Sequence, residues 1–517
     1  MTHLNGPATA VFVFFFAAVA VIGFFSGRWR RGDLNRIEEW GLGGRRFGTI
    51  ITWFLIGGDF YTAYTLIAVP ALVFGVGAYG FFALVYTIIV YPFFFAVMPR
   101  LWRVAHRHNY VTVADFTQGR YGNHWLALGV ALSGILATMP YIALQLVGMQ
   151  YAIAALGFTR TGIPLFVSFL VLAAWDYTSG LRAPAAIALI KDSMVYIFVI
   201  VAVVWVPMKL GGYSHIFHSA AVALAQHAAP GHLILPSSDF LAFATLALGS
   251  AFAAFLYPHT ATSVLSSSSG KAIKRNAVFL PAYTLLLGLI ALLGYMALTA
   301  GVHVQSSNDV VPALFLQLFP SWFAGFCFAA IAIGGLVPAA IMSIASASLF
   351  TRNIYRQYFR PRMSDREQSV VAKLVSLLIK LGALAFVLWG NATYVINLQL
   401  LGGIWILQTL PAVVFGLYRR WFHPWALVLG WVAGMVSGTA MAWSRGIAVV
   451  YPLHLLGHTF GAYGGVYALI LNLVVAAVLT PVFHRLRLPA GSDETEPLDY
   501  AEDWLVRASP GKAPAMP

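Results

Sequence analysis

Long apolar segments alternate with short polar connections along almost the whole chain. A helix that crosses a bilayer needs about 20 predominantly apolar residues, and by that criterion the pattern predicts about thirteen spans. The sequence therefore predicts an all-α polytopic membrane protein. The predicted spans are 8–27, 48–76, 79–98, 125–156, 163–178, 190–209, 238–266, 277–301, 320–350, 370–390, 394–417, 424–444 and 461–483.

Two of these spans contain residues that interrupt a helix. The second holds GGDFYTAYT, Gly57 to Thr65, and the seventh holds Tyr257, Pro258 and His259. Proline removes an N–H and clashes with the preceding turn, and irregular backbone persists at bilayer depth only where it lines a cavity or is buried in protein. Paired interruptions in corresponding spans point to the central site of a transporter.

The two interrupted spans lie five spans apart, which predicts two five-helix halves related by inverted pseudo-symmetry. The expected organisation is an N-terminal helix and loop, two repeats, two C-terminal helices and a disordered cytoplasmic tail. These units correspond to 1–47, 48–209, 238–417, 424–483 and 484–517.

Composition and charge support a membrane protein and set its orientation. The chain is 60% hydrophobic and 9% charged, with a mean hydropathy of +0.80. Its net charge of +14 comes from basic residues in the loops between spans, which argues against a nucleic-acid partner. Nearly all of these residues fall on one side if the N-terminus is outside, as the positive-inside rule requires. We therefore expect a cytoplasmic C-terminus.

Several segments resemble the sodium:solute symporter family along nearly the whole chain. They include TVADFTQGRYG, PYIALQLVG, YPHTATSVLSSSSGKAIKRNA and AAIAIGGLVPAAIMSIASASLFTRNIYR. RWRRGDLN and EWGLGGRRFG are similar to the bacterial monocarboxylate permease branch. The resemblance implies thirteen helices, with a leucine-transporter-like five-plus-five core behind one extra N-terminal helix, in the bacterial inner membrane.

The resemblance also implies a sodium site between the interrupted second span and the ninth. Its ligands map onto the carbonyls of Gly57 and Phe60 and onto Ala340, Ser343 and Ile344. Na⁺ is a hard cation that takes oxygen ligands, and Ile344 has no hydroxyl to offer. Because this oxygen is missing, H⁺ is a stronger candidate for the coupling ion than the resemblance alone suggests.

The interruption and the resemblance together give a set of expected substrate contacts. Asp59 adds a carboxylate at the first interruption, where the alternative is an aspartate that caps freed N–H groups. His259 is either a substrate contact or a histidine hydrogen-bonded within a packed helix. The expected substrate-binding residues are Asp59, Tyr61, Thr62, Tyr141, Gln145, Tyr257, His259 and Lys380.

Three further charged residues fall in or near spans. Lys380 lies well inside its span, so it either reaches back to water along its stem or faces the core to pair with a carboxylate or an anionic substrate. In the core it is expected to serve coupling, as an ammonium that stands in for the lost sodium ion, or to bind the substrate carboxylate. Asp192 is expected on the ion route, the alternative being a salt bridge with Arg182 or Lys191. We expect Asp176 to be structural.

No sequence motif indicates an enzyme: a Walker A loop is absent, and HxxxH and HExxH spacings occur in no single span. The sequence and the resemblance predict a symporter that imports a small monocarboxylate such as lactate, pyruvate, acetate or propionate, with alanine as a further candidate. Its partners are H⁺ or Na⁺ and the lipid bilayer, with no cofactor unless Na⁺ is counted. The alternative is a proline-like amino-acid or pantothenate symporter of the same fold.

Overall fold

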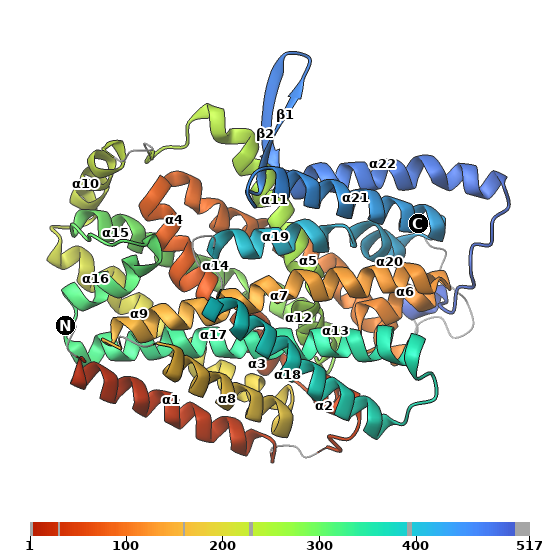
Figure 1. Cartoon of the computed structure of the whole chain (residues 1–517), viewed down its shortest axis with the longest axis horizontal. Coiled ribbons are helices and arrows are strands. Elements are labelled where there is room, and N and C mark those ends of the chain that lie inside the picture. The colour runs from red at the N-terminus through yellow and green to blue at the C-terminus, as the bar shows by residue number, and fades with distance from the viewer. Residues whose placement is uncertain (1–3, 29–31, 159–160, 227–230, 390–394, 502–517) are drawn as a thin grey trace.

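The computed structural model describes residues 4–28, 32–158, 161–226, 231–389 and 395–501 as an almost entirely helical bundle (Figure 1). The helices are α1 (Gly6–Ser26), α2 (Ile37–Leu42), α3 (Thr49–Gly58), α4 (Val69–Val76), α5 (Phe82–Arg107), α6 (Val113–Tyr121), α7 (His124–Ala155), α8 (Gly162–Ser179), α9 (Arg182–Lys209), α10 (Tyr213–Ala225), α11 (Phe240–Leu256), α12 (Pro258–Leu265), α13 (Gly270–Phe279), α14 (Pro281–Ala291), α15 (Leu293–Thr299), α16 (Val310–Leu318), α17 (Ser321–Leu349), α18 (Asp365–Trp389), α19 (Val395–Leu407), α20 (Gly416–Tyr418), α21 (Pro424–Ser444) and α22 (Gly464–Arg485).

Within the described residues, 11 helices are long and apolar enough to cross a membrane, or up to 12 if a bent pair counts as one span. The pair is Asn397–Leu407 and Pro411–Tyr418, which meet at 45°. Two shorter apolar helices, Thr49–Gly58 and Tyr64–Val76, flank the first interruption. The predicted count of thirteen is not confirmed, because the second predicted span is broken into two helices that are each shorter than a full membrane crossing.

The long helix α17 lies at the centre of the bundle, and its apolar stretch is completely buried (Figure 1). Small residues let neighbouring backbones approach it closely. A Cβ on Gly325 would lie 2.2 Å from the carbonyl oxygen of Ala8 in α1, and one on Gly335 would lie 2.8 Å from that of Gln145 in α7. These contacts fix α1 and α7 against the central helix.

Both predicted interruptions are present. At the first interruption, α3 ends at Gly58, a turn follows, and a π-helical segment at Tyr64–Ala68 leads into α4. The second break is at Tyr257, whose ψ of 140° separates α11 from α12. Pro258 then opens α12 at a position where its missing N–H costs no helical hydrogen bond.

The segment after α22 corrects one sequence-based expectation. Residues from 484 were expected to be disordered, but those up to 501 pack against the bundle, and Pro497–Tyr500 forms a short 3₁₀ helix. The buried Arg120 donates to the Asp493 carboxylate at 2.7 Å and to Thr495 at 3.1 Å, and Tyr500 is buried. Polar residues of this stretch form specific contacts with the helical bundle. Residues 502–517 lie outside the described part.

A β-hairpin that the sequence did not predict joins α21 to α22. Strands β1 (Val450–Leu455) and β2 (His458–Tyr463) pair in antiparallel register around Leu456 and Gly457. Both turn residues have positive φ, 50° and 79°, which is the backbone form that matches the twist of a two-residue hairpin. The last predicted span, 461–483, therefore begins three residues early.

Candidate substrate and ion site at two helix breaks

The two helix breaks lie against each other in the middle of the fold. Ser263 of α12 donates a hydrogen bond to the Asp59 carboxylate at 3.3 Å, and Asp59 is buried. The rings of Tyr257 and His259 lie 5.1 Å apart, and the ring of Tyr141 from α7 lies 5.5 Å from each. The structure thus brings residues from three expected site segments together.

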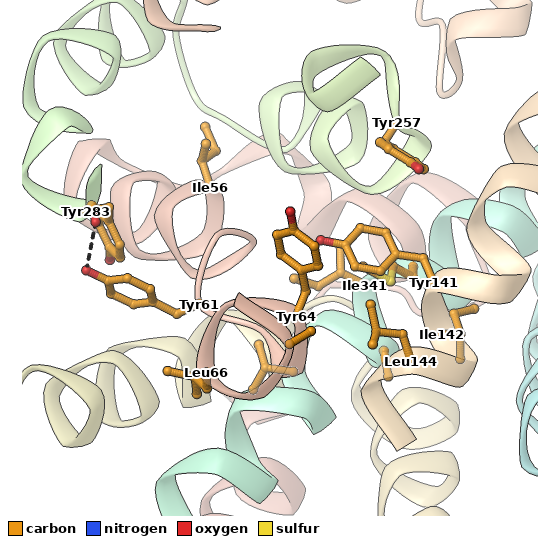
Figure 2. Close-up of a cluster of buried hydrophobic side chains, with 14 of the residues drawn as sticks. Ile56, Tyr61, Tyr64, Leu66, Tyr141, Ile142, Leu144, Tyr257, Tyr283 and Ile341 are labelled. Atoms are coloured by element: carbon orange, nitrogen blue, oxygen red, sulfur yellow. Dashed lines mark hydrogen bonds between the residues drawn. The ribbon is translucent and has the colours of Figure 1, made fainter. Parts of the chain in front are cut away.

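Helix α7 supplies polar groups to the first break. The Gln145 side-chain oxygen accepts a hydrogen bond from the Ala63 N–H at 2.9 Å, which satisfies one backbone donor of the broken helix. The Tyr141 hydroxyl lies near the Thr62 side chain. Figure 2 shows Tyr64 beside Tyr141, so two aromatic hydroxyls border the break.

Four buried polar atoms around these breaks have no hydrogen-bond partner among the described residues. Buried polar groups in native proteins are almost always paired, so such a cluster calls for an explanation, and a bound solute is one. The amide nitrogen and the hydroxyl are donors, and the carboxylate oxygen is an acceptor unless it is protonated. The atoms are Asp59 Oδ1, the Tyr64 hydroxyl, Gln145 Nε2 and His259 Nδ1.

The unpartnered Asp59 Oδ1 also bears on the alternative for this residue. An aspartate that capped the freed backbone would accept from N–H groups. Its other oxygen accepts from Ser263, a side chain of the opposite break. The structure therefore does not show the capping role.

Lys191 of α9 holds the broken backbone from the other side. Its ammonium donates to the carbonyl oxygens of Gly58 at 2.7 Å and Tyr61 at 3.1 Å. It also forms an ion pair with Asp192 at 2.9 Å, and both residues are fully buried. Arg182, the other suggested partner of Asp192, pairs with Glu39 instead.

An aromatic cluster closes this side of the site. The Tyr283 hydroxyl of α14 donates to the Asp192 carboxylate at 2.8 Å. The backbone carbonyl of Tyr283 accepts from the Tyr61 hydroxyl at 3.3 Å (Figure 2). The Tyr283 ring also occupies the space that a Cβ on Gly57 would need, at 2.2 Å. Gly57 is therefore required for this packing as well as for the helix break.

The expected sodium ligands are engaged in other contacts. The Gly57 carbonyl accepts from the Phe60 N–H at 2.9 Å, and the Phe60 carbonyl accepts from the Thr65 hydroxyl. The carbonyls that face a cationic group belong to the following residues, Gly58 and Tyr61. On α17, the Ser343 hydroxyl lies 2.8 Å from the carbonyl oxygen of Ala340, as a helical serine commonly does.

Lys380 lies away from the breaks, in contact with Asp176 of α8. Its ammonium is 2.5 Å from the Asp176 carboxylate and donates to Ser376 at 2.7 Å. Ser343 lies 3.1 Å from the same carboxylate. Lys380 and Asp176 are both buried, so Lys380 does not reach back to water. Of the two alternatives for Lys380, the structure shows pairing with a carboxylate, and a contact with substrate stays a prediction.

Sequence reasoning missed the most informative contacts. It treated Lys191 only as a salt-bridge partner, and it did not single out Ser263, Tyr64 or Tyr283. One signal was available: two adjacent charged residues, Lys191 and Asp192, stand inside one apolar segment, where both must find partners. No comparable signal marks a serine or tyrosine among many others.

Similarity to known proteins identifies the family of this chain. The model of the sodium:solute symporter family matches residues 40–434, which is more than half of the chain. The chain belongs to the sodium:solute symporter family. A monocarboxylate transport permease protein of Rhizobium johnstonii is 56% identical over 479 residues, which make up 92% of this chain and 97% of that protein.

Two further likenesses agree with the family. An uncharacterized symporter of Bacillus subtilis is 32% identical to this symporter over 491 residues, covering 93% of this chain and 95% of that protein. The solved structure of a Na⁺-coupled sialic acid symporter in a substrate-bound outward-open state aligns with a TM-score of 0.74 at 15% identity. That alignment covers 92% of this chain and 98% of the other. The fold is that of the leucine-transporter-like symporters.

Proposed function

We propose that this symporter imports small monocarboxylates, such as lactate, pyruvate, acetate or propionate, by alternating access driven by an H⁺ or Na⁺ gradient. The observation that carries the proposal is the cluster of unpartnered polar atoms where the two helix breaks meet. The name of the 56% identical relative supports the substrate class. Alanine is a further candidate cargo.

The chemistry of the cluster suits a small carboxylate. Gln145 Nε2 and the Tyr64 hydroxyl are unpartnered neutral donors, and a carboxylate accepts from such groups. The first turn of α12 lies at the same place, and a helix N-terminus favours a negative charge. The rings of Tyr141, Tyr257 and His259 offer an apolar wall for a short alkyl chain.

Asp59 gives the same site a group that can carry a proton. A charged carboxylate beside a carboxylate cargo would repel it, so binding of the anion favours a protonated Asp59. We assign Asp59, Gln145 and His259 to cargo binding, and Asp192 to coupling.

The test is counterflow in proteoliposomes without any ion gradient. Vesicles loaded with unlabelled lactate should take up radiolabelled lactate, and pyruvate, acetate and propionate should compete. Proline and pantothenate, the cargoes of the alternative function, should not. Proline or pantothenate counterflow without any monocarboxylate exchange would overturn the proposal in favour of that alternative.

A further inference from the structure

A lysine ammonium lies among oxygen atoms of the kind that would coordinate a coupling cation. Lys191 Nζ is 2.7 Å from the Gly58 carbonyl oxygen, 3.1 Å from that of Tyr61 and 2.9 Å from Asp192 Oδ1. Oxygens gathered around one cationic centre at a broken helix are what a hard cation such as Na⁺ requires. Here the chain itself supplies the positive charge.

The remaining ligands expected for Na⁺ do not fit that ion. Ile344 offers no oxygen, and Ser343 is engaged by the Asp176–Lys380 pair and by Ala340. The α17 half of the expected sodium set therefore lies in a network that contains the Lys380 ammonium, and the Gly58 and Tyr61 carbonyls, each one residue after an expected carbonyl ligand, face the Lys191 ammonium. A sodium ion placed against the Gly58 and Tyr61 carbonyls would meet like charge at Lys191.

We infer that Lys191 takes the place of a coupling sodium ion, so that this symporter is driven by protons and does not need Na⁺. The inference rests on the proposed transport function and deepens it. When the site opens towards the inner side, Lys191 loses a proton to water there. One Nζ–H bond breaks, and its electron pair stays on nitrogen. Water on the outer side returns a proton to the amine when the site faces outward.

The step follows from the contacts of the ammonium, which is tied to backbone whose geometry must change. A neutral amine keeps two donors but loses its charge-assisted hold on the Gly58 and Tyr61 carbonyls and its ion pair. The broken helix is then released from α9. Loss of the proton is thereby linked to movement of the segment that carries Asp59.

The titratable groups that face Lys191 are few and come from three elements. Asp192 and Tyr196 lie on α9 itself, Asp59 and Tyr61 lie at the break after α3, and Tyr283 lies on α14. Two carboxylates and one ammonium make a cluster that is negative overall when fully ionised. Loss of the Lys191 proton takes this cluster from a charge of −1 to −2, and return of the proton to the amine restores it, so each turn of the cycle moves one positive charge through the site.

The experiment measures accumulation of radiolabelled lactate in proteoliposomes under a pH gradient and, separately, under a Na⁺ gradient. The wild type should accumulate lactate under the pH gradient and equally well without Na⁺. Lys191→Gln should lose at least tenfold of this accumulation and its dependence on external pH, while lactate still exchanges in counterflow. The matched control is Lys209→Gln, at the other end of the same helix, which should behave like the wild type.

Each result has a separate meaning. Accumulation by the wild type that follows the Na⁺ gradient, or Lys191→Gln protein that accumulates lactate as the wild type does, would overturn the inference. Lys191→Gln protein that loses counterflow as well would overturn it too, because Lys191 would then serve the cargo site itself. A wild type that exchanges no monocarboxylate would instead refute the proposed function.

Discussion

The ammonium of Lys380 lies 2.5 Å from the carboxylate of Asp176, and both side chains are buried between α18 and α8. Removing one member of a buried pair leaves an uncompensated charge, whereas replacing both removes the charges together. The pair joins a helix of the first half of the chain to one of the second. Replacing both members of the pair therefore distinguishes a structural role of Lys380 from a role in cargo binding.

We expect Asp176→Asn and Lys380→Met each to lower the free energy of unfolding by about 3–5 kcal/mol. The double variant should regain most of that loss and bind lactate with the affinity of the wild type. Thermal unfolding in detergent and a lactate binding assay measure the two quantities. A double variant that is stable but has lost lactate affinity would show that Lys380 contacts the cargo.

Gly57→Ala tests the close packing at the first break. The added Cβ would lie 2.2 Å from the Tyr283 ring, so the ring must move and its hydrogen bond to Asp192 must lengthen. We expect destabilisation of about 1–3 kcal/mol and a loss of lactate uptake of at least tenfold. Gly48→Ala is the control, because a Cβ there has open space. Equal uptake by both variants would contradict the packing described.

His423 gives a pH dependence outside the spans. Burial lowers the pKa of His423, and its neutral ring accepts from the Trp425 N–H at 3.2 Å and lies 3.2 Å from the Leu488 carbonyl oxygen. Because the folded-state pKa lies below the unfolded value of about 6.5, this contribution is present above pH 6.5. It is lost as the pH falls through the folded-state value.

We expect acidification from pH 7 to pH 5 to remove about 1 kcal/mol of stability through His423, the usual worth of a helix cap. His423→Asn keeps a side-chain acceptor at the cap and cannot titrate. Thermal unfolding across this pH range should be less steep for the variant than for the wild type. Parallel curves would mean that the cap does not depend on the charge of His423.

The segment after α22 should be held by Arg120. Its guanidinium donates to Gly416 O at 2.9 Å and to the Asp493 carboxylate at 2.7 Å. We expect Arg120→Gln to make the bonds after Arg485 and Arg487 several-fold more sensitive to trypsin. Arg445→Gln, at an exposed site near the β-hairpin, should leave cleavage unchanged. Unaltered cleavage in Arg120→Gln would place the anchor of this segment elsewhere.

The helix breaks could be predicted because their cause is local. Gly57, Gly58 and Pro258 weaken a helix wherever they stand in it, and apolar flanks place them at bilayer depth. Membrane insertion could be predicted equally well, because the 60% hydrophobic composition is a property of the chain as a whole. These features needed no knowledge of which helices are neighbours.

The contacts of the lysines could not be predicted in this way. Lys191 and Lys380 are both buried charges, and only the rotation and tilt of α9 and α18 decide which one meets the broken helix. The same holds for the carbonyls: the resemblance pointed to Gly57 and Phe60, but the local turn presents those of Gly58 and Tyr61. A shift of one residue is invisible without coordinates.

The most direct test of the central claim is protection of the site from a thiol reagent by its cargo. With Cys327→Ala as background, Thr62→Cys and Ser263→Cys each place a thiol at the meeting point of the two breaks, and Ser444→Cys places a control thiol at the end of α21. Saturating lactate should slow modification of the first two several-fold and leave the control unchanged, and proline should protect none. Unchanged rates at Thr62→Cys and Ser263→Cys, in protein that still exchanges lactate, would place cargo binding elsewhere and contradict the account.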